Sequence, residues 1–171
     1  SVERLSLTQE KILAILPIPS AILSILGSSV ILYMALKSRL TRKWTPYTRL
    51  LVAMSVCDII FSLTIGIATF LRPAETSLRV WAFGNHATCS AIGFLNQFSF
   101  SAVFYNGMLS FYFLLTARFR LKNEFIAKWI EPFMHFSSIG YPLTTAIVGS
   151  ALDFWGEITH GISGWVGKYP H

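Results

Sequence analysis

Charged residues are scarce in this chain. They make up 13% of its 171 residues, whereas an average soluble domain contains roughly 25%. So few charges cannot cover the surface of a soluble protein. Disordered chains lack apolar and aromatic residues, but 53% of the residues here are apolar and 15% are aromatic. The composition therefore excludes both a soluble domain and a disordered chain.

Cysteines and the motifs of catalysis are also few. Two cysteines cannot build a disulfide scaffold. The four histidines are scattered and form no H-x-x-H or H-E-x-x-H metal box. The chain contains no P-loop, no G-x-S-x-G elbow and no C-x-x-C motif. We therefore expect no enzyme, no metal site and no cofactor.

Long apolar stretches are present instead, and there are four of them. They cover about residues 12–36, 50–71, 89–117 and 129–152. A helix needs about 20 mostly apolar residues to cross a bilayer, so each stretch has the length of a span. The sequence predicts an all-α membrane protein with four transmembrane helices, which form a single domain over residues 1–171.

Lysine and arginine gather in two of the three connecting loops. Nine of the fourteen lie in the first and third loops: Lys37, Arg39, Arg42, Lys43, Arg49, Arg118, Arg120, Lys122 and Lys128. Short loops rich in these residues mark the cytoplasmic side of a membrane. We expect the N-terminus, the second loop and the tail after residue 152 to lie outside. Because both basic clusters adjoin spans, we expect the lipid bilayer as a partner and no nucleic acid.

Each apolar stretch also carries small and polar residues at helical spacing. They are Ser20, Ser24 and Ser28 in the first; Ser55, Asp58, Ser62 and Gly66 in the second; Asn96, Ser99, Asn106 and Ser110 in the third; and Ser138, Tyr141 and Thr145 in the fourth. In lipid, such residues mark the faces on which helices meet. We expect all four stripes to point into the bundle, and ordinary helix packing accounts for most of them.

Asp58 needs more than packing. A carboxylate near the middle of a span costs about 2.5–3.5 kcal/mol on insertion scales, so it requires a partner, water, a cation or a proton. One interpretation is a structural tie from Asp58 to Ser28 and to the third span. The other is a titrating or cation-binding switch, with Ser28, Ser62 and Asn106 as the candidate site around Asp58.

Two further features lie at the span ends. Glu131 and His135 are four residues apart, so they can bond to each other on one helix face. Cys89 lies at the outward end of the third span, in a compartment that permits disulfides. Cys57 is a poor partner because it lies well inside the second span. Cys89 is therefore either free or bonded to a cysteine beyond His171.

These elements together resemble the seven-helix G-protein-coupled receptors. The run Ile25–Ser29 is similar to the Gly-Asn element of receptor helix one, with Ser28 in place of Asn. The run Leu51–Asp58 is similar to the Leu-Ala-x-x-Asp element of helix two, and the family aspartate falls on Asp58. The family's first outer loop has a motif that Trp81, Phe83 and Gly84 resemble, and Cys89 is similar to the cysteine of its helix three. Cys89, Gly93, Phe94 and Gln97, with the run Tyr105–Tyr112, look most like the cyclic-AMP-receptor-like branch.

The resemblance implies a multi-pass receptor of the plasma membrane. Such a receptor transmits the signal of an extracellular ligand, here unknown, to a heterotrimeric G protein. The resemblance also implies a disulfide from Cys89 to the second outer loop, and a coupling surface at Arg118, Arg120 and Lys122. It further implies that residues 1–171 are an N-terminal fragment with the first four helices of an incomplete seven-helix bundle. The alternative is a four-span transporter, channel or membrane scaffold with Asp58 on an ion path.

Overall fold

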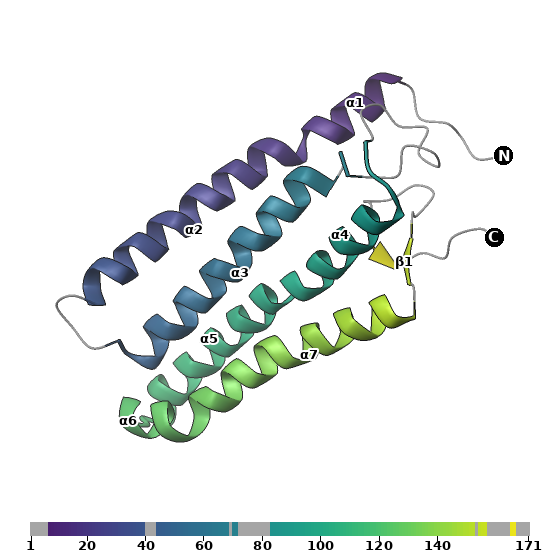
Figure 1. The fold of residues 1–171 in the computed structure, drawn as a ribbon. Helices are drawn as coiled ribbons and strands as arrows, with labels where there is room; N and C mark the ends of the chain where they lie inside the picture. Colours follow the sequence, from purple (N-terminus) through teal and green to yellow (C-terminus); the bar gives the residue numbers. More distant parts are fainter. Residues whose placement is uncertain are drawn as a thin grey trace.

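The computed structural model describes residues 7–39, 44–68, 70–71, 83–152, 154–156 and 165–166. These residues form long helices and one pair of two-residue strands (Figure 1). Three helices are long and apolar enough to cross a membrane: Pro17–Ser38, Pro46–Ala68 and Ala87–Ala117. They indicate a multi-pass membrane protein. A fourth long helix, α7 (Glu131–Ala151), lies beside them.

The first two long helices begin at prolines. Helix α1 (Leu7–Ile15) ends before α2 (Pro17–Arg39) begins, because Pro17 has no N–H to donate and disfavours helical geometry in the residue before it. The expected span 12–36 is therefore divided near its start. Helix α3 (Pro46–Ala68) begins four residues before the expected start at residue 50, with Pro46 at its first position, where a missing N–H costs nothing.

The third stretch forms two helices in line, α4 (His86–Ser99) and α5 (Ser101–Ala117), with an interruption at Phe100. A capping box fixes the start of α4. The Asn85 side chain accepts from the Thr88 backbone N–H at 2.9 Å, and the Thr88 hydroxyl accepts from the Asn85 N–H at 2.8 Å. The helix therefore begins three residues earlier than expected.

The fourth helix begins before residue 129 and changes its winding. A short turn, α6 (Asn123–Phe125), leads into the π-helix η1 (Ile126–Ile130), and α7 follows without a gap. Helix α7 is not one of these three candidate spans, because its 21 residues include Glu131, His135 and several Ser, Thr and Pro residues. After α7, strand β1 (Trp155–Gly156) pairs antiparallel with β2 (Trp165–Val166).

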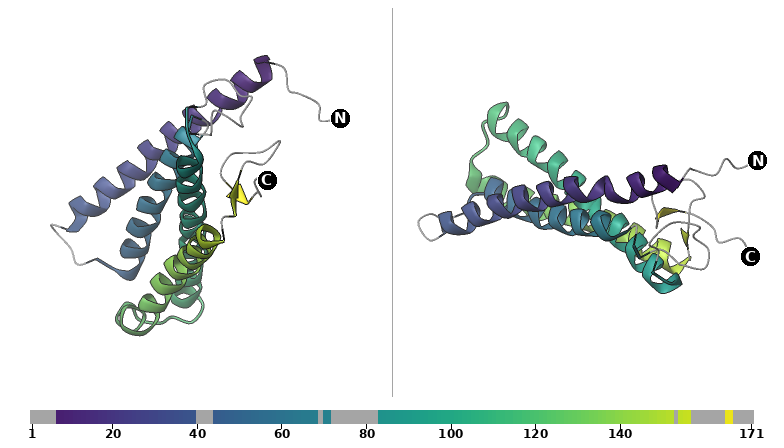
Figure 2. Two further views of the ribbon diagram at one scale, coloured as in Figure 1. Left: turned by 45° about the vertical axis from the view of Figure 1, so that its right-hand side comes forward. Right: turned by 90° about the horizontal axis from the view of Figure 1, so that it is seen from above.

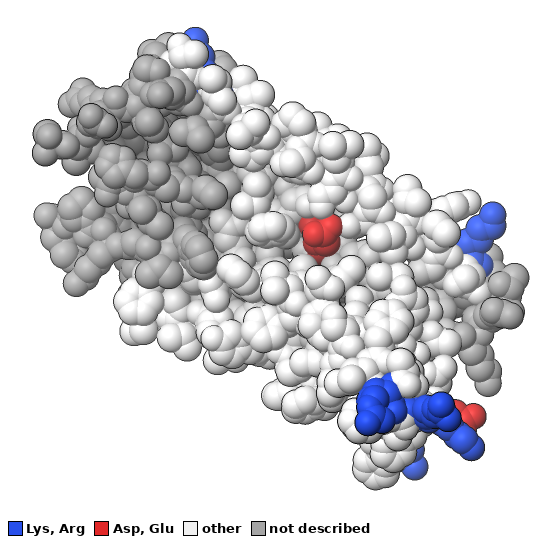
Figure 3. Space-filling view, turned by 180° about the vertical axis from the view of Figure 1, so that it is seen from behind, with Lys and Arg blue, Asp and Glu red and all other residues white. Residues whose placement is uncertain are grey.

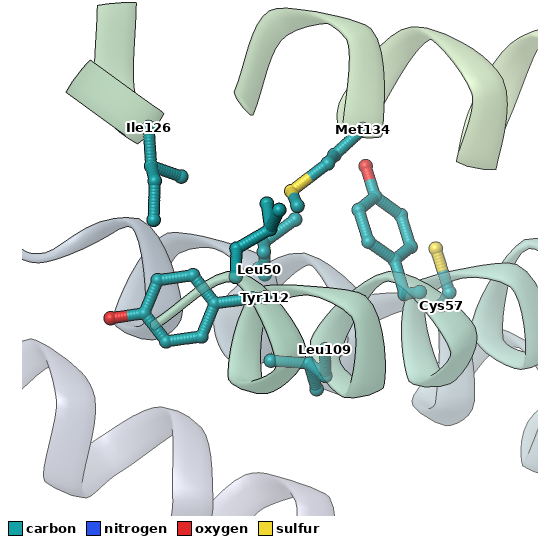
Figure 4. Close-up of a cluster of buried hydrophobic side chains, with 8 residues drawn as sticks. Leu50, Cys57, Leu109, Tyr112, Ile126 and Met134 are labelled. Carbon is teal, nitrogen blue, oxygen red and sulfur yellow. The ribbon is translucent and has the colours of Figure 1, made fainter. Parts of the chain in front are cut away.

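The helices pack in a chain of neighbours. Helix α2 packs mainly on α3, α3 packs on α4 and α5, and α7 packs on α4 and α5 (Figures 1 and 2). The main apolar cluster lies between α3, α5, η1 and α7 (Figure 4) and consists of Leu50, Cys57, Tyr105, Leu109, Tyr112, Leu115, Ile126 and Met134. We call the end of the bundle where α3 and α7 begin and α5 ends the basic end.

Candidate functional site

Asp58 lies in the interface between α2 and α3. Ser24 and Ser28 on α2 each donate a hydrogen bond to its Oδ2 atom, at 2.9 and 2.5 Å. The Asp58 side chain is half-buried, and its Oδ1 atom has no hydrogen-bond donor within the described ranges. One carboxylate oxygen is thus held by two hydroxyls, and the other is available to a proton, a water molecule or a cation.

Small residues bring the two backbones together around Asp58. Along α1 and α2 the buried positions recur every seven residues, at Ala14 on α1 and at Ala21, Ser28 and Ala35 on α2. This is the spacing of a two-helix coiled-coil seam, and small side chains allow close approach in lipid. Ala21 Cβ lies 3.5 Å from the position that a Cβ on Gly66 of α3 would occupy. The close packing places the short serine side chains within reach of Asp58.

The predicted stripes are only partly buried. Ser55, Ser62, Asn96, Ser99 and Ser138 are buried. Three buried oxygens, Ser55 Oγ, Asn96 Oδ1 and Ser138 Oγ, accept or donate no hydrogen bond within the part of the chain that the structure describes. Ser20 is exposed and donates instead to the Pro17 carbonyl of its own helix at 2.8 Å. Of the expected series on α2, Ser24 and Ser28 therefore face Asp58, and only Ser20 does not.

Asn106 does not join Asp58. It is exposed on α5, as is Ser110, whose hydroxyl donates to the Asn106 carbonyl at 3.1 Å. The buried face of α5 instead contains Tyr105 and Leu109. At about 100° per residue, the ten-residue step from Asn96 to Asn106 turns the helix to roughly 80° short of three full turns. The two side chains therefore point in different directions. The expected third stripe thus leaves the inward face along its length.

A second polar site lies at the basic end. Arg49 near the start of α3 meets Glu131 at the start of α7 through two hydrogen bonds, Nε to Oε1 and Nη2 to Oε2, the latter 2.5 Å long. The Glu131 side chain is only 7% exposed and that of Arg49 is 37% exposed. This two-point geometry is the strongest form of a guanidinium–carboxylate pair. Breaking such a pair by removing one partner strands a charge out of water.

The same arginine connects to α2. Arg49 Nη1 donates to the Trp44 carbonyl at 3.1 Å, and the Trp44 indole N–H donates to the Ala35 carbonyl at 3.2 Å. The pair also continues toward α5. His135 Nε2 lies 3.5 Å from Glu131 Oε1, and its Nδ1 lies 2.9 Å from the Tyr105 hydroxyl. The polar contacts therefore join α2, α3, α5 and α7.

Sequence reasoning anticipated the Glu131–His135 contact from its spacing but missed Arg49. Arg49 and Glu131 are 82 residues apart, so no local pattern pairs them. One signal was present: the chain places an acid at the start of the fourth apolar stretch and a base at the start of the second, both beside basic loops. Charges of opposite sign at the same depth of a bundle are candidates for pairing.

The candidate coupling residues lie together at the basic end. Arg118, Arg120 and Lys122 are exposed after the end of α5. Arg120 has a φ of 52°, a left-handed conformation that reverses the chain toward α6. Lys128 lies 5.4 Å over the ring of Trp129. Figure 3 shows most of the visible basic side chains gathered at this end, and one acidic patch midway along an otherwise uncharged face.

The opposite end contains the candidate outer-loop residues. Cys89 is buried, Phe83 is 77% exposed, and Trp81 lies outside the described residues. Gly84 packs so closely on Leu71 that a Cβ there would stand 2.0 Å from the Leu71 carbonyl oxygen. The Thr88 hydroxyl donates to the same carbonyl at 2.9 Å. Neither Cys57 nor Cys89 forms a disulfide among the described residues.

No cluster of metal-ligating side chains occurs in the part of the chain searched, which covers the described ranges. Comparison with protein-family models, curated proteins and solved structures finds no match to this chain.

Proposed function

We propose that this chain forms the first four helices of a seven-helix G-protein-coupled receptor that transmits an extracellular signal to a heterotrimeric G protein. The observation that carries the proposal is the Asp58 site, in which a half-buried carboxylate in the second span is held by two hydroxyls of the first. An acid inside a span is costly and is retained where it has a task. Asp58 is also the residue on which the family aspartate falls.

The distribution of charge supports an orientation for the receptor. Basic residues at the ends of α2 and α5 and the beginnings of α3 and α7 favour the cytoplasmic side for the basic end. The exposed residues Arg118, Arg120 and Lys122 then face the G protein, and Cys89 and Gly84 face the ligand side. In this proposal α7 crosses the membrane as the fourth span. Its length and its packing against α4 and α5 support that assignment.

The proposed task of Asp58 is to bias helix packing through its occupancy. When a cation or proton occupies the free Oδ1 side, the negative charge between α2 and α3 is compensated. When the site is empty, Ser24 and Ser28 alone compensate it. A ligand shifts such an equilibrium only as far as its affinities for the two packings differ.

The test uses the full-length native protein in nanodiscs with a purified heterotrimeric G protein. GDP release is measured in sodium chloride and in potassium chloride at equal ionic strength. We expect the wild-type protein to accelerate release to a different extent in the two salts, and Asp58→Asn to abolish the difference. Glu124→Gln, which changes an exposed acid at the basic end, is the control and should preserve it.

The alternative function, a transporter or channel with Asp58 on an ion path, predicts a different result. Liposomes that contain the protein would then take up sodium, and Asp58→Asn would stop the uptake. Sodium uptake without any effect on GDP release would replace the receptor proposal with this alternative. The absence of both activities would refute both functions.

A further inference from the structure

The π-helix η1 immediately precedes the Arg49–Glu131 ion pair. The Glu131 N–H donates to the Ile126 carbonyl five residues earlier, instead of four residues earlier as in an α-helix. Along α7 the buried residues follow ordinary helical spacing: Glu131, Met134, Ser138, Pro142, Ala146 and Gly149. The preceding buried residue is Ile126, five positions before Glu131. The wide turn therefore places Ile126 and Glu131 on one inward face.

An α-helical turn here would present a different side chain to the core. Spacings of three or four residues before Glu131 lead to Lys128 or Ala127, and Lys128 is exposed in the structure. Relaxation of the π turn would rotate the preceding residues by about 100° relative to α7. It would remove Ile126 from the apolar cluster and direct Lys128 toward it. Burial of Ile126 and the pairing of Glu131 thus oppose the intrinsic preference of the backbone.

The ion pair also ties helices that do not otherwise pack extensively. Helix α7 packs mainly on α4 and α5, and the bonds from Arg49 to Glu131 form a polar link between α3 and α7 in addition to the apolar cluster. The apolar cluster includes Tyr105, Met134 and the buried residue Cys57, and Figure 4 labels Met134 and Cys57. If Arg49 and Glu131 separate, the apolar cluster loses the ion pair that lies beside it at the basic end.

We propose that the Arg49–Glu131 pair and the π turn form a two-state joint. In the closed state the pair holds the start of α7 against α3, and the π turn keeps Ile126 buried. In the open state the pair is broken, the turn relaxes, and the segment 118–130 with its basic residues rotates away. Packed elements with two discrete arrangements are the usual basis of such switches. The regulatory consequence, control of G-protein coupling, rests on the proposed function.

The buried thiol of Cys57 reports the state of the joint. The full-length native protein in nanodiscs is treated with N-ethylmaleimide, and peptide mass spectrometry separates alkylation of Cys57 from that of Cys89. We expect Glu131→Gln to raise the Cys57 alkylation rate by about tenfold, the effect of about 1.4 kcal/mol on a closed–open equilibrium. Glu124→Gln, an exposed acid outside the pair, should alkylate as slowly as the wild type.

Exchange of the two charges separates the effect of losing the ion pair from the other effects of substituting either residue. Arg49→Glu combined with Glu131→Arg should restore alkylation to within about twofold of the wild type, because neighbouring residues couple when they interact directly. The double variant also keeps the proposal testable if Glu131→Gln does not fold. A Glu131→Gln protein that folds and alkylates at the wild-type rate would overturn the proposal. A folded double variant with rapid Cys57 alkylation would do the same.

Removal of the exposed residue Trp129 tests the π turn itself, because Ala127 rather than Lys128 then stands three residues before Glu131. The deletion leaves Ile126 and Glu131 four residues apart, so an ordinary α-helix now holds both inward and the strain is gone. We expect this variant to remain closed, with slow Cys57 alkylation, and to reduce the GDP release that the wild type stimulates. Unchanged GDP release in a receptor with proven activity would overturn the role of the π turn. If the wild-type protein stimulates no GDP release, the proposed function fails, and the alkylation rates still decide whether the joint exists.

Discussion

Removal of the Ser28 hydroxyl should loosen α2 from the rest of the bundle. The Ser28–Asp58 hydrogen bond is the shorter of the two at this site, and Ser28 is buried. A hydrogen bond to a charged group contributes about 1.5–3 kcal/mol in soluble proteins, and interhelical bonds in membranes average about 0.6 kcal/mol with a maximum near 1.7. We therefore expect Ser28→Ala to destabilise the protein by about 1–1.5 kcal/mol, near the upper end of the membrane range.

The pair of serines should behave cooperatively. With one hydroxyl removed, Oδ2 of Asp58 retains the other donor. With both removed, the carboxylate approaches the cost of an unpartnered acid in a span, about 2.5–3.5 kcal/mol. Ser24→Ala with Ser28→Ala should therefore cost about 3 kcal/mol, more than the sum of the single changes. In an Asp58→Asn background, the same double change should cost less, because no charge is stranded.

Steric-trap unfolding in bicelles measures these free energies, with biotin tags on α2 and α3. Ser29→Ala is the matched control, because Ser29 is adjacent to Ser28 and exposed. A Ser28→Ala cost that equals the Ser29→Ala cost would refute the assignment of Ser28 as a partner of Asp58. Additive serine effects that are the same with Asn at position 58 would refute the role of the charge.

Two glycine substitutions test the ends of the helices. Gly84→Ala should destabilise the protein by about 3 kcal/mol, because its Cβ would collide with the Leu71 carbonyl oxygen, which is backbone and cannot move aside alone. Gly149→Ala should cost about 1–3 kcal/mol, since its Cβ would lie 2.3 Å from the ring of buried Trp155. Gly107→Ala is the control for both, since open space surrounds that position and alanine favours the helix by about 1 kcal/mol. Thermal unfolding in detergent should show both midpoints below that of Gly107→Ala; a Gly84→Ala midpoint equal to the control would contradict the Leu71 packing.

Composition and apolar length were sufficient to predict the helices, because a bilayer leaves few ways to satisfy backbone groups in so apolar a chain. Their boundaries depended on local chemistry, such as Pro17, Pro46 and the Asn85–Thr88 cap. The inward direction of Asp58 followed from the cost of a charge in lipid. The position of Asn106 did not, because a step of ten residues ends about 80° away from the same helical face and because the helix is interrupted at Phe100.

The Arg49–Glu131 pair could not be predicted from periodicity. Its formation depends on which helices are neighbours and on the additional residue in the π turn before Glu131. Ordinary helical periodicity assumes one winding throughout, so it assigns the wrong phase to any segment before such a turn. The residues that escaped prediction are thus those whose placement needs the order of helices in space.

The hydrogen bonds from Ser24 and Ser28 on α2 to Asp58 on α3 bear on how the protein is synthesised. The bonded residues are only 30 and 34 residues apart, so they meet as soon as the second apolar helix leaves the ribosome. Translation then needs roughly 4–15 s to add the 73 residues from Ile59 to Glu131. Throughout that interval the nascent hairpin already provides hydroxyl donors for its only intramembrane acid in α3. Helices α2 and α3 can therefore pack against each other in the bilayer before the later helices are synthesised, and the later helices then assemble onto this pair.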